Sequence, residues 1–201
     1  MSIIVEHEKR RHEILEKALD VFIEEGYEDV TFQKIADKCD ITRTTLYIYF
    51  KNKRDIFNFS IKQFLQILES DISKIIKQEG LSYTEKLIGV MIVVIDRLEE
   101  NKRLLSVVLD YLVFISKSDV DPDYRVRRRT VRLRHILASL LIEGIKTGEF
   151  SSPATVKEAN DLLYSFVDAA VFRMVVLNRS SVDELKDSIK LTVRLLLKPK
   201  N

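Results

Sequence analysis

The sequence TFQKIADKCDITRTTLYIYFKNK, residues 31–53, has the spacing of two short helices joined by a tight turn. In its first half, apolar residues recur at i, i+3, i+4 and i+7, which places them on one helical face: Phe32, Ile35, Ala36 and Cys39. Thr31 precedes this face and can cap the helix with its hydroxyl group. Asp40 suits the turn because aspartate tolerates a left-handed backbone, and Thr42 can cap the second helix. The pattern predicts a helix-turn-helix.

In the second helix, Leu46 and Phe50 point inward together, which leaves the opposite half as an outer surface. Arginine can pair with guanine, threonine with bases or phosphates, and an apolar side chain with a thymine methyl group. We expect bases to be read by Gln33, Arg43 and Thr44, and phosphates to be held by Thr31, Tyr47, Tyr49 and Lys53. The full predicted DNA-binding set is Thr31, Gln33, Thr42, Arg43, Thr44, Tyr47, Ile48, Tyr49, Lys51 and Lys53.

Three motifs in this region resemble the DNA-binding signature of the tetracycline-repressor (TetR) family: Thr31-Phe-Gln-Lys-Ile-Ala, Ile41-Thr-Arg-Thr-Thr-Leu-Tyr-Ile-Tyr-Phe and Lys51-Asn-Lys-Arg-Asp-Ile-Phe. The resemblance spans Lys9 to Phe57 and departs from the family at Asp40, where glycine is common. It implies a transcriptional repressor that binds a palindromic operator as a homodimer. It also implies release by a small-molecule effector, and pairing of subunits through the last two long helices.

Composition indicates an all-α protein without a membrane partner. Only five glycines and three prolines occur in 201 residues, and hydrophobic residues make up 46% of the chain. The net charge of +2 means that DNA binding depends on a local basic patch. The single cysteine excludes an intrachain disulfide framework, and neither a secretory signal nor a transmembrane span is evident, so we expect a cytoplasmic location.

Apolar periodicity and helix-ending residues predict the remaining elements. Residues 1–8 are expected to form a loose arm, and the first helix to run from Lys9 to Glu25 and to end at Gly26. A connecting helix continues to about Gly80, and further helices are expected at 82–101, 102–116, 122–147, 153–178 and 181–198. We predict a helix-turn-helix domain at 1–54 and a helical effector-binding and dimerisation domain at 55–201.

The second domain is long enough to hold a ligand as well as a dimer interface. Aromatic, Met and acidic side chains that can line a cavity between helices are Phe64, Met91, Asp110, Tyr111, Phe114, Tyr164, Phe166, Asp168 and Met174. The expected dimer contacts are Phe166, Ala169, Ala170, Arg173, Leu185, Ile189, Val193 and Leu196. Residues 162–176 are apolar nearly all round, which fits a central core helix as well as an interface helix. Asp110, Asp168 and Arg173 fit either a polar ligand group or an ion pair.

Other function classes have less support in the sequence. A run of arginines between Arg125 and Arg134 is interpreted as a solvated or salt-bridged face, with Glu99 and Glu100 as candidate partners. The scattered histidines and the absence of a phosphate loop or nucleophile motif indicate no metal, no cofactor and no enzyme. The alternatives are a helical scaffold protein without specific DNA binding and a transcriptional activator with the same fold.

Overall fold

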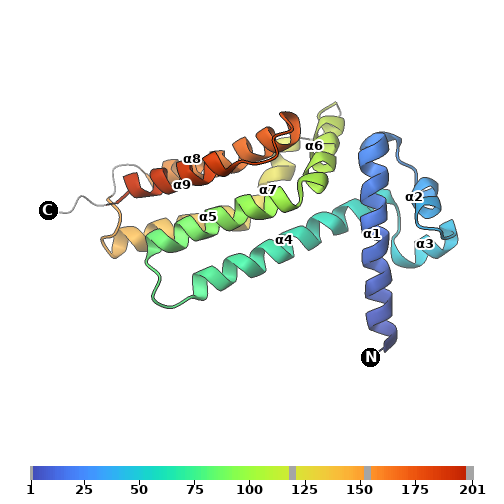
Figure 1. Cartoon of the computed structure of the whole chain (residues 1–201), viewed down its shortest axis with the longest axis horizontal. Helices are drawn as coiled ribbons and strands as arrows, with labels where there is room; N and C mark the ends of the chain where they lie inside the picture. The colour runs from blue at the N-terminus through green and yellow to red at the C-terminus, as the bar shows by residue number, and fades with distance from the viewer. Residues whose placement is uncertain (1, 118–120, 152–154, 198–201) are drawn as a thin grey trace. The chain divides into compact units, whose positions relative to one another are not determined.

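The computed structural model describes residues 2–117, 121–151 and 155–197, and these residues are almost entirely helical (Figure 1). The elements are α1 Ser2–Asp29, α2 Phe32–Lys38, α3 Arg43–Tyr49, α4 Lys53–Lys77, α5 Tyr83–Glu100, α6 Lys102–Ser116, α7 Pro122–Lys146, α8 Val156–Val171, the π-helical turn η1 Phe172–Val176, and α9 Asp183–Leu195. Extended pairing in these residues is limited to one bridge between Phe150 and Leu197. The predicted all-α fold is confirmed.

The chain forms two compact units. The first is Met1–Gln66 with Arg103–Pro122, and the second is Ile67–Lys102 with Asp123–Asn201. Helix α4 therefore begins in the first unit and ends in the second, while α6 packs with the N-terminal helices. These units divide the chain at different places from the predicted functional boundary between residues 54 and 55, which stays a prediction.

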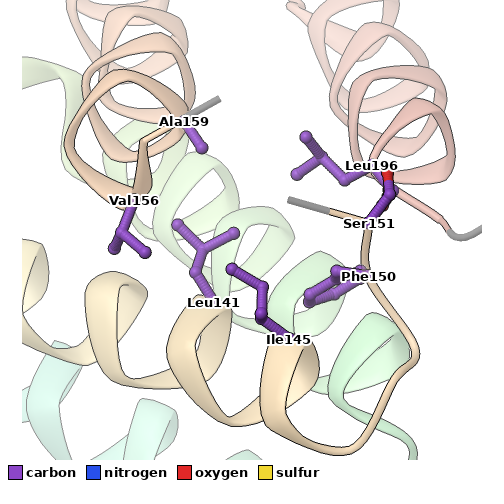
Figure 2. A pocket seen from close by; sticks show the side chains of 7 residues that line it. All are labelled: Leu141, Ile145, Phe150, Ser151, Val156, Ala159 and Leu196. Carbon is purple, nitrogen blue, oxygen red and sulfur yellow. The ribbon is translucent and has the colours of Figure 1, made fainter. Parts of the chain in front are cut away.

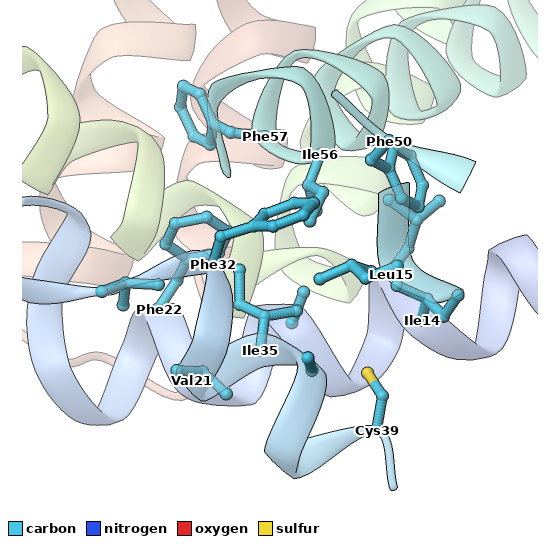
Figure 3. Packing of buried hydrophobic residues seen from close by; sticks show 14 of the residues in the cluster. Ile14, Leu15, Val21, Phe22, Phe32, Ile35, Cys39, Phe50, Ile56 and Phe57 are labelled. Carbon is cyan, nitrogen blue, oxygen red and sulfur yellow. The ribbon is translucent and has the colours of Figure 1, made fainter. Parts of the chain in front are cut away.

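The first unit has one apolar core that joins α1, α2, α3 and the start of α4 (Figure 3). The predicted inward stripe of α2 is buried, with Ile35 and Ala36 fully so, and Leu46 of α3 is equally inaccessible. Cys39 is a free thiol in this core, and burial raises its pKa. Val107 of α6 also belongs to this core. Because these side chains come from several helices, the core fixes the helix-turn-helix against α1 and α4.

Helix α1 is longer than predicted and is interrupted where predicted. The expected arm at residues 1–8 is wrong, because Ser2 to Glu8 continue the helix without a glycine or proline to end it. At Gly26 the backbone leaves helical geometry, with φ of 80° and ψ of 156°. Only glycine adopts such a positive φ without strain. The break separates the long part of α1 from a final short turn that leads into α2.

In the second unit α5, α8 and α9 pack on one another (Figure 1). Helix α5 buries its apolar stripe, which includes Leu87, Val90, Met91, Val94 and Ile95. Capping boxes begin α5 at Ser82 with Glu85 and α8 at Thr155 with Glu158. The predicted start of α8 at Pro153 lies outside the described residues.

Candidate nucleic-acid interface

Helices α2 and α3 form a helix-turn-helix whose ends are fixed by side-chain caps. The Thr31 hydroxyl accepts a hydrogen bond from the Lys34 N–H at 3.2 Å, and the Thr42 hydroxyl accepts one from the Thr45 N–H at 3.0 Å. Asp40 occupies the left-handed region with φ of 56°, as its place in the turn predicts, and its carboxylate lies 3.0 Å from the Lys17 ammonium group. The local sequence therefore builds this turn as expected.

The outer face of α3 presents the predicted reading side chains to solvent. Arg43 Nη2 donates a hydrogen bond to the Tyr47 hydroxyl at 3.1 Å, and the guanidinium carbon lies 5.6 Å from the centre of that ring. Ile48 is 67% exposed and Thr44 is also exposed. A side chain as apolar as Ile48 at such exposure, beside exposed donors, matches a surface that contacts base edges and thymine methyl groups.

Three other residues of the predicted DNA-binding set differ in their exposure and in their partners within the protein. Gln33 is exposed, and its Nε2 donates to Asp37 Oδ1 at 2.7 Å. Lys51 extends into solvent, while its backbone N–H donates to Asp55 Oδ2 at 3.1 Å. Tyr49 is half-buried, and its ring stacks on His7 with centroids 4.6 Å apart. Gln33 and Lys51 are thus available to a duplex, whereas the Tyr49 ring packs beside α1.

The side chain of Lys53, which the sequence predicts to hold a phosphate, binds the protein backbone in this structure. Its ammonium group donates to the carbonyl oxygens of Tyr27, Glu28 and Val30 at 2.8, 2.7 and 2.8 Å. These three bonds use all three N–H donors of a lysine. Burial lowers the Lys53 pKa, partly opposed by the charges of Asp29 and Glu28. Spacing along the sequence gives no indication of this contact, because the acceptors lie more than twenty residues earlier.

The predicted effector residues fall in both compact units. Phe64, Asp110, Tyr111 and Phe114 belong to the first, and Met91, Tyr164, Phe166, Asp168 and Met174 belong to the second. Tyr111 packs in the first unit, with its ring centroid 4.7 Å from that of Tyr27 and 4.8 Å from that of Phe57. Met91 and Met174 are fully buried. Several of these side chains therefore serve as core residues.

A cavity in the second unit is lined by none of them (Figure 2). It encloses about 10 Å³, room for a single water molecule. Its walls are mostly apolar and consist of Leu141, Ile145, Phe150, Ser151, Val156, Ala159 and Leu196. A cavity of this size and lining fills part of the core and does not define a ligand site.

A polar cluster lies between α7 and α8. It contains two of the predicted effector residues, Tyr164 and Asp168, and Arg134, which the sequence predicts on a solvated face. The Arg134 guanidinium lies 3.7 Å from the centre of the Tyr164 ring and donates to Asp161 at 2.9 Å. Burial raises the pKa values of Tyr164 and Asp168. Arg134 Nε and Asn160 Oδ1 are buried without a hydrogen-bond partner among the described atoms.

Elsewhere on α7 the arginine run forms ion pairs. Arg127 pairs with Asp123 at 2.6 Å, and Arg132 pairs with Glu69. The expected partners Glu99 and Glu100 instead bind Lys186 and Arg97. The predicted salt-bridged face is present, but with different acids.

The predicted dimer residues divide between core and surface. Ala170, Leu185, Ile189 and Val193 are buried in the second unit, so they are not available to a second subunit. The exposed apolar residues of these helices are instead Leu162, Phe172, Val176, Leu191 and Leu195. The sequence predicts that the most apolar stripe of α9 faces a partner. The subunit instead packs this stripe into its own core.

The described residues lack two further features. No helix there is both long and apolar enough to span a bilayer. No group of three His, Cys, Asp or Glu side chains in that part of the chain is arranged to hold a metal ion.

Comparison with known proteins agrees with this geometry. The family model "Bacterial regulatory proteins, tetR family" matches residues 14–58. The "Fatty acid metabolism regulator protein" of Bacillus subtilis is 27% identical over 168 residues, which is 82% of each chain. The "HTH-type transcriptional repressor KstR2" of Mycolicibacterium smegmatis is 27% identical over 79% of this chain and 74% of its own.

A solved structure, the transcriptional regulator FadR from Bacillus subtilis in complex with stearoyl-CoA, superposes with a TM-score of 0.68 at 26% identity. The match covers 92% of this chain and 97% of FadR. The helix-turn-helix, the family match and the likeness along most of the chain lead to one conclusion. Residues 14–58 match the TetR-family DNA-binding model, and the protein is a DNA-binding transcriptional regulator.

Proposed function

We propose that the protein is a homodimeric repressor in which each subunit places α3 in a major groove of a palindromic operator. The observation that carries this proposal is the two-sided character of α3. Leu46 anchors the helix in the core, while Arg43, Thr44, Tyr47 and Ile48 project from its outer side. In dimeric helix-turn-helix proteins the two half-sites lie about one helical turn, roughly 34–36 Å, apart.

Within each helix-turn-helix, base reading is assigned to Gln33, Arg43, Thr44 and Ile48. Phosphate contacts are assigned to the remaining exposed residues of the predicted set: Thr31, Thr42, Tyr47 and Lys51. Lysines of α2 contribute less charge, because Lys34 pairs with Glu25 and Lys38 pairs with Glu24 of α1. The positive field is therefore concentrated at Arg43, Lys51 and the start of α4.

Dimerisation is assigned to the exposed apolar face of α8, η1 and α9. Phe172 and Val176 are each more than half exposed, and Leu191 and Leu195 are 59% and 73% exposed. Large apolar side chains at such exposure indicate a protein contact. A two-fold contact through this face gives the symmetry that a palindromic operator requires.

The effector is proposed to be a fatty acyl-CoA, because a relative of this chain is a fatty acid metabolism regulator and the similar FadR structure holds stearoyl-CoA. The cavity of Figure 2 is far too small for an acyl chain. We therefore propose that the helices of the second unit separate around Tyr164, Phe166 and Met174 when the acyl chain binds. An effector that binds such an opened arrangement better than the closed one weakens DNA binding, and DNA weakens effector binding by the same factor.

The test begins with selection of duplexes from a random-sequence library by the full-length protein. The expected product is a palindrome bound by two subunits, and stearoyl-CoA is expected to release it while free coenzyme A and stearate are not. Transcription in vitro from a promoter that overlaps the selected site separates repression from activation. Selection of no sequence, or a monomer bound to a single half-site, would exclude the proposal.

A further inference from the structure

The backbone N–H and carbonyl groups of Tyr27 join three helices of the first unit. Its N–H donates a hydrogen bond to the carboxylate of Asp110 on α6. Its carbonyl accepts one from Lys53 Nζ, at the start of α4. Its ring is buried against Phe22 of α1 and Phe57 of α4, with centroids 5.7 and 5.1 Å apart. One residue at the end of α1 is thus bonded to both α4 and α6.

The backbone conformation next to Tyr27 brings it close to Asp110. Gly26 holds a φ of 80°, and a Cβ atom at this position would lie 3.4 Å from Asp110 Oδ2. Lys53 also binds the carbonyls of Glu28 and Val30, so its ammonium group closes the C-terminal end of α1. Residues 26–30 lead directly into Thr31, the cap of α2. Their position therefore determines where α2 and α3 stand against α4 and α6.

We infer that Lys53 and Asp110 form a clamp on residues 26–30 that sets the position of the reading helix, so that both are positioning residues for operator binding. This inference rests on the proposed operator binding and goes beyond it in two ways. Lys53 binds backbone carbonyl groups instead of a phosphate. Asp110 binds the Tyr27 N–H next to the helix-turn-helix instead of an effector. Both clamp residues lie on helices whose chains continue directly into the second unit, α4 past Gln66 and α6 before Arg103.

Salt dependence separates the clamp from a phosphate contact. Each phosphate contact contributes about 0.9 to the slope of log affinity against log salt concentration on duplex DNA. We expect Lys53→Met to lower affinity for the selected duplex about 10-fold or more, because three carbonyl groups lose their donor. The slope between about 50 and 200 mM salt should stay unchanged. A slope that falls by about one unit would overturn the inference.

Lys53→Arg keeps the charge and guards against a variant that fails to fold. A guanidinium group is planar and cannot converge three N–H donors on one point, whereas it binds phosphate well. The clamp predicts that Lys53→Arg loses operator affinity, while a phosphate contact predicts that it retains it. Retained affinity would contradict the clamp.

Asp110→Ala tests the other side of the clamp. It should lower operator affinity with an unchanged salt slope, although Asp110 carries no positive charge for DNA. Asp20→Ala is the matched control, because Asp20 also links α1 to α6, through Arg103, but lies away from residues 26–30. In the double variant of Lys53→Met and Asp110→Ala, the affinity loss should be smaller than the product of the single losses. Multiplicative losses, or equal losses for Asp20→Ala and Asp110→Ala, would exclude a common clamp.

Amide hydrogen exchange tests the same coupling without DNA, and so separates a failure of the clamp from a failure of operator binding. The Tyr27 amide is bonded to Asp110, not to Lys53. The clamp nevertheless predicts that Lys53→Met speeds exchange at Tyr27 more than at amides of the α2 interior such as Ala36. Unchanged exchange at Tyr27 would refute the inference even if wild-type protein binds its operator.

Discussion

The outer surfaces of α3 and α9 are both exposed to solvent, but they have opposite chemistry. On α3 the exposed side chains include Arg43, Thr44 and Tyr47, which carry hydrogen-bond donors. On α9 the large exposed apolar side chains are Leu191 and Leu195. A hydrated polyanion such as DNA offers acceptors to the first surface, whereas only another apolar surface gains by covering the second. In the proposed dimer, the first surface of each subunit therefore binds the duplex and the second binds the other subunit.

The inner faces of the two helices are alike. Leu46 of α3 and Ile189 of α9 are both fully buried, and both helices are too short to be stable alone. Packing of the inner side chains therefore holds each helix in place. Changes on the outer faces should alter binding with little effect on folding, and changes on the inner faces should do the reverse.

The largest effect is expected from Leu191→Asp combined with Leu195→Asp. Two charges on the apolar face should prevent subunit pairing and lower operator affinity by about 100-fold or more, because the advantage of two linked heads is lost. Sedimentation should show a folded monomer. Lys190→Glu changes the charge on another side of the same helix and should leave the dimer intact. A dimeric double variant would place the interface elsewhere.

Ile189→Ala should act on stability instead of pairing. Removing a fully buried isoleucine side chain costs about 2–5 kcal/mol in free energy of unfolding. Urea denaturation measures this loss, and sedimentation at low temperature should still show a dimer. If Ile189→Ala dissociated the dimer without lowering stability, the inner and outer faces of α9 would have to be exchanged.

Arg43→Ala should cost about 1–3 kcal/mol of operator binding, concentrated at one base pair. Affinities for operator variants that differ at single positions test this, since the preference at the contacted pair should disappear. The comparison variant is Lys51→Ala, which should weaken all sequences alike and lower the salt slope by about 0.9. An equal loss for Arg43→Ala on every duplex would make it a phosphate contact.

Thr42→Ala should have the smallest effect, about 1 kcal/mol in stability, because the Thr45 N–H at the start of α3 loses its acceptor. Thr42→Ser retains the hydroxyl and should restore most of this loss. Thermal unfolding of both variants provides the measurement. A serine variant as unstable as the alanine variant would mean that the threonine methyl group, not the cap, is responsible.

The sequence predicts the helix-turn-helix well because its signals are local. Caps at Thr31 and Thr42, the left-handed Asp40 and the buried stripe of α2 each depend on residues within a few positions of one another. Periodicity is weaker evidence on α9, since it shows that Leu185, Ile189 and Val193 share a face but not what covers that face. The same limit applies to Tyr111, whose aromatic character fits a ligand cavity and whose place is the core of the first unit.

Local pattern was thus sufficient for the fold class, the helix-turn-helix and its outward side chains, because hydrogen bonds within a turn and apolar spacing along a helix involve neighbouring residues. The use of Lys53 depended on tertiary structure, since its three acceptors are supplied by the end of α1. The partner of Asp110 lies 83 positions away at Tyr27. Contacts at such separation arise only when the chain folds back on itself, and no spacing within the sequence indicates which ends will meet.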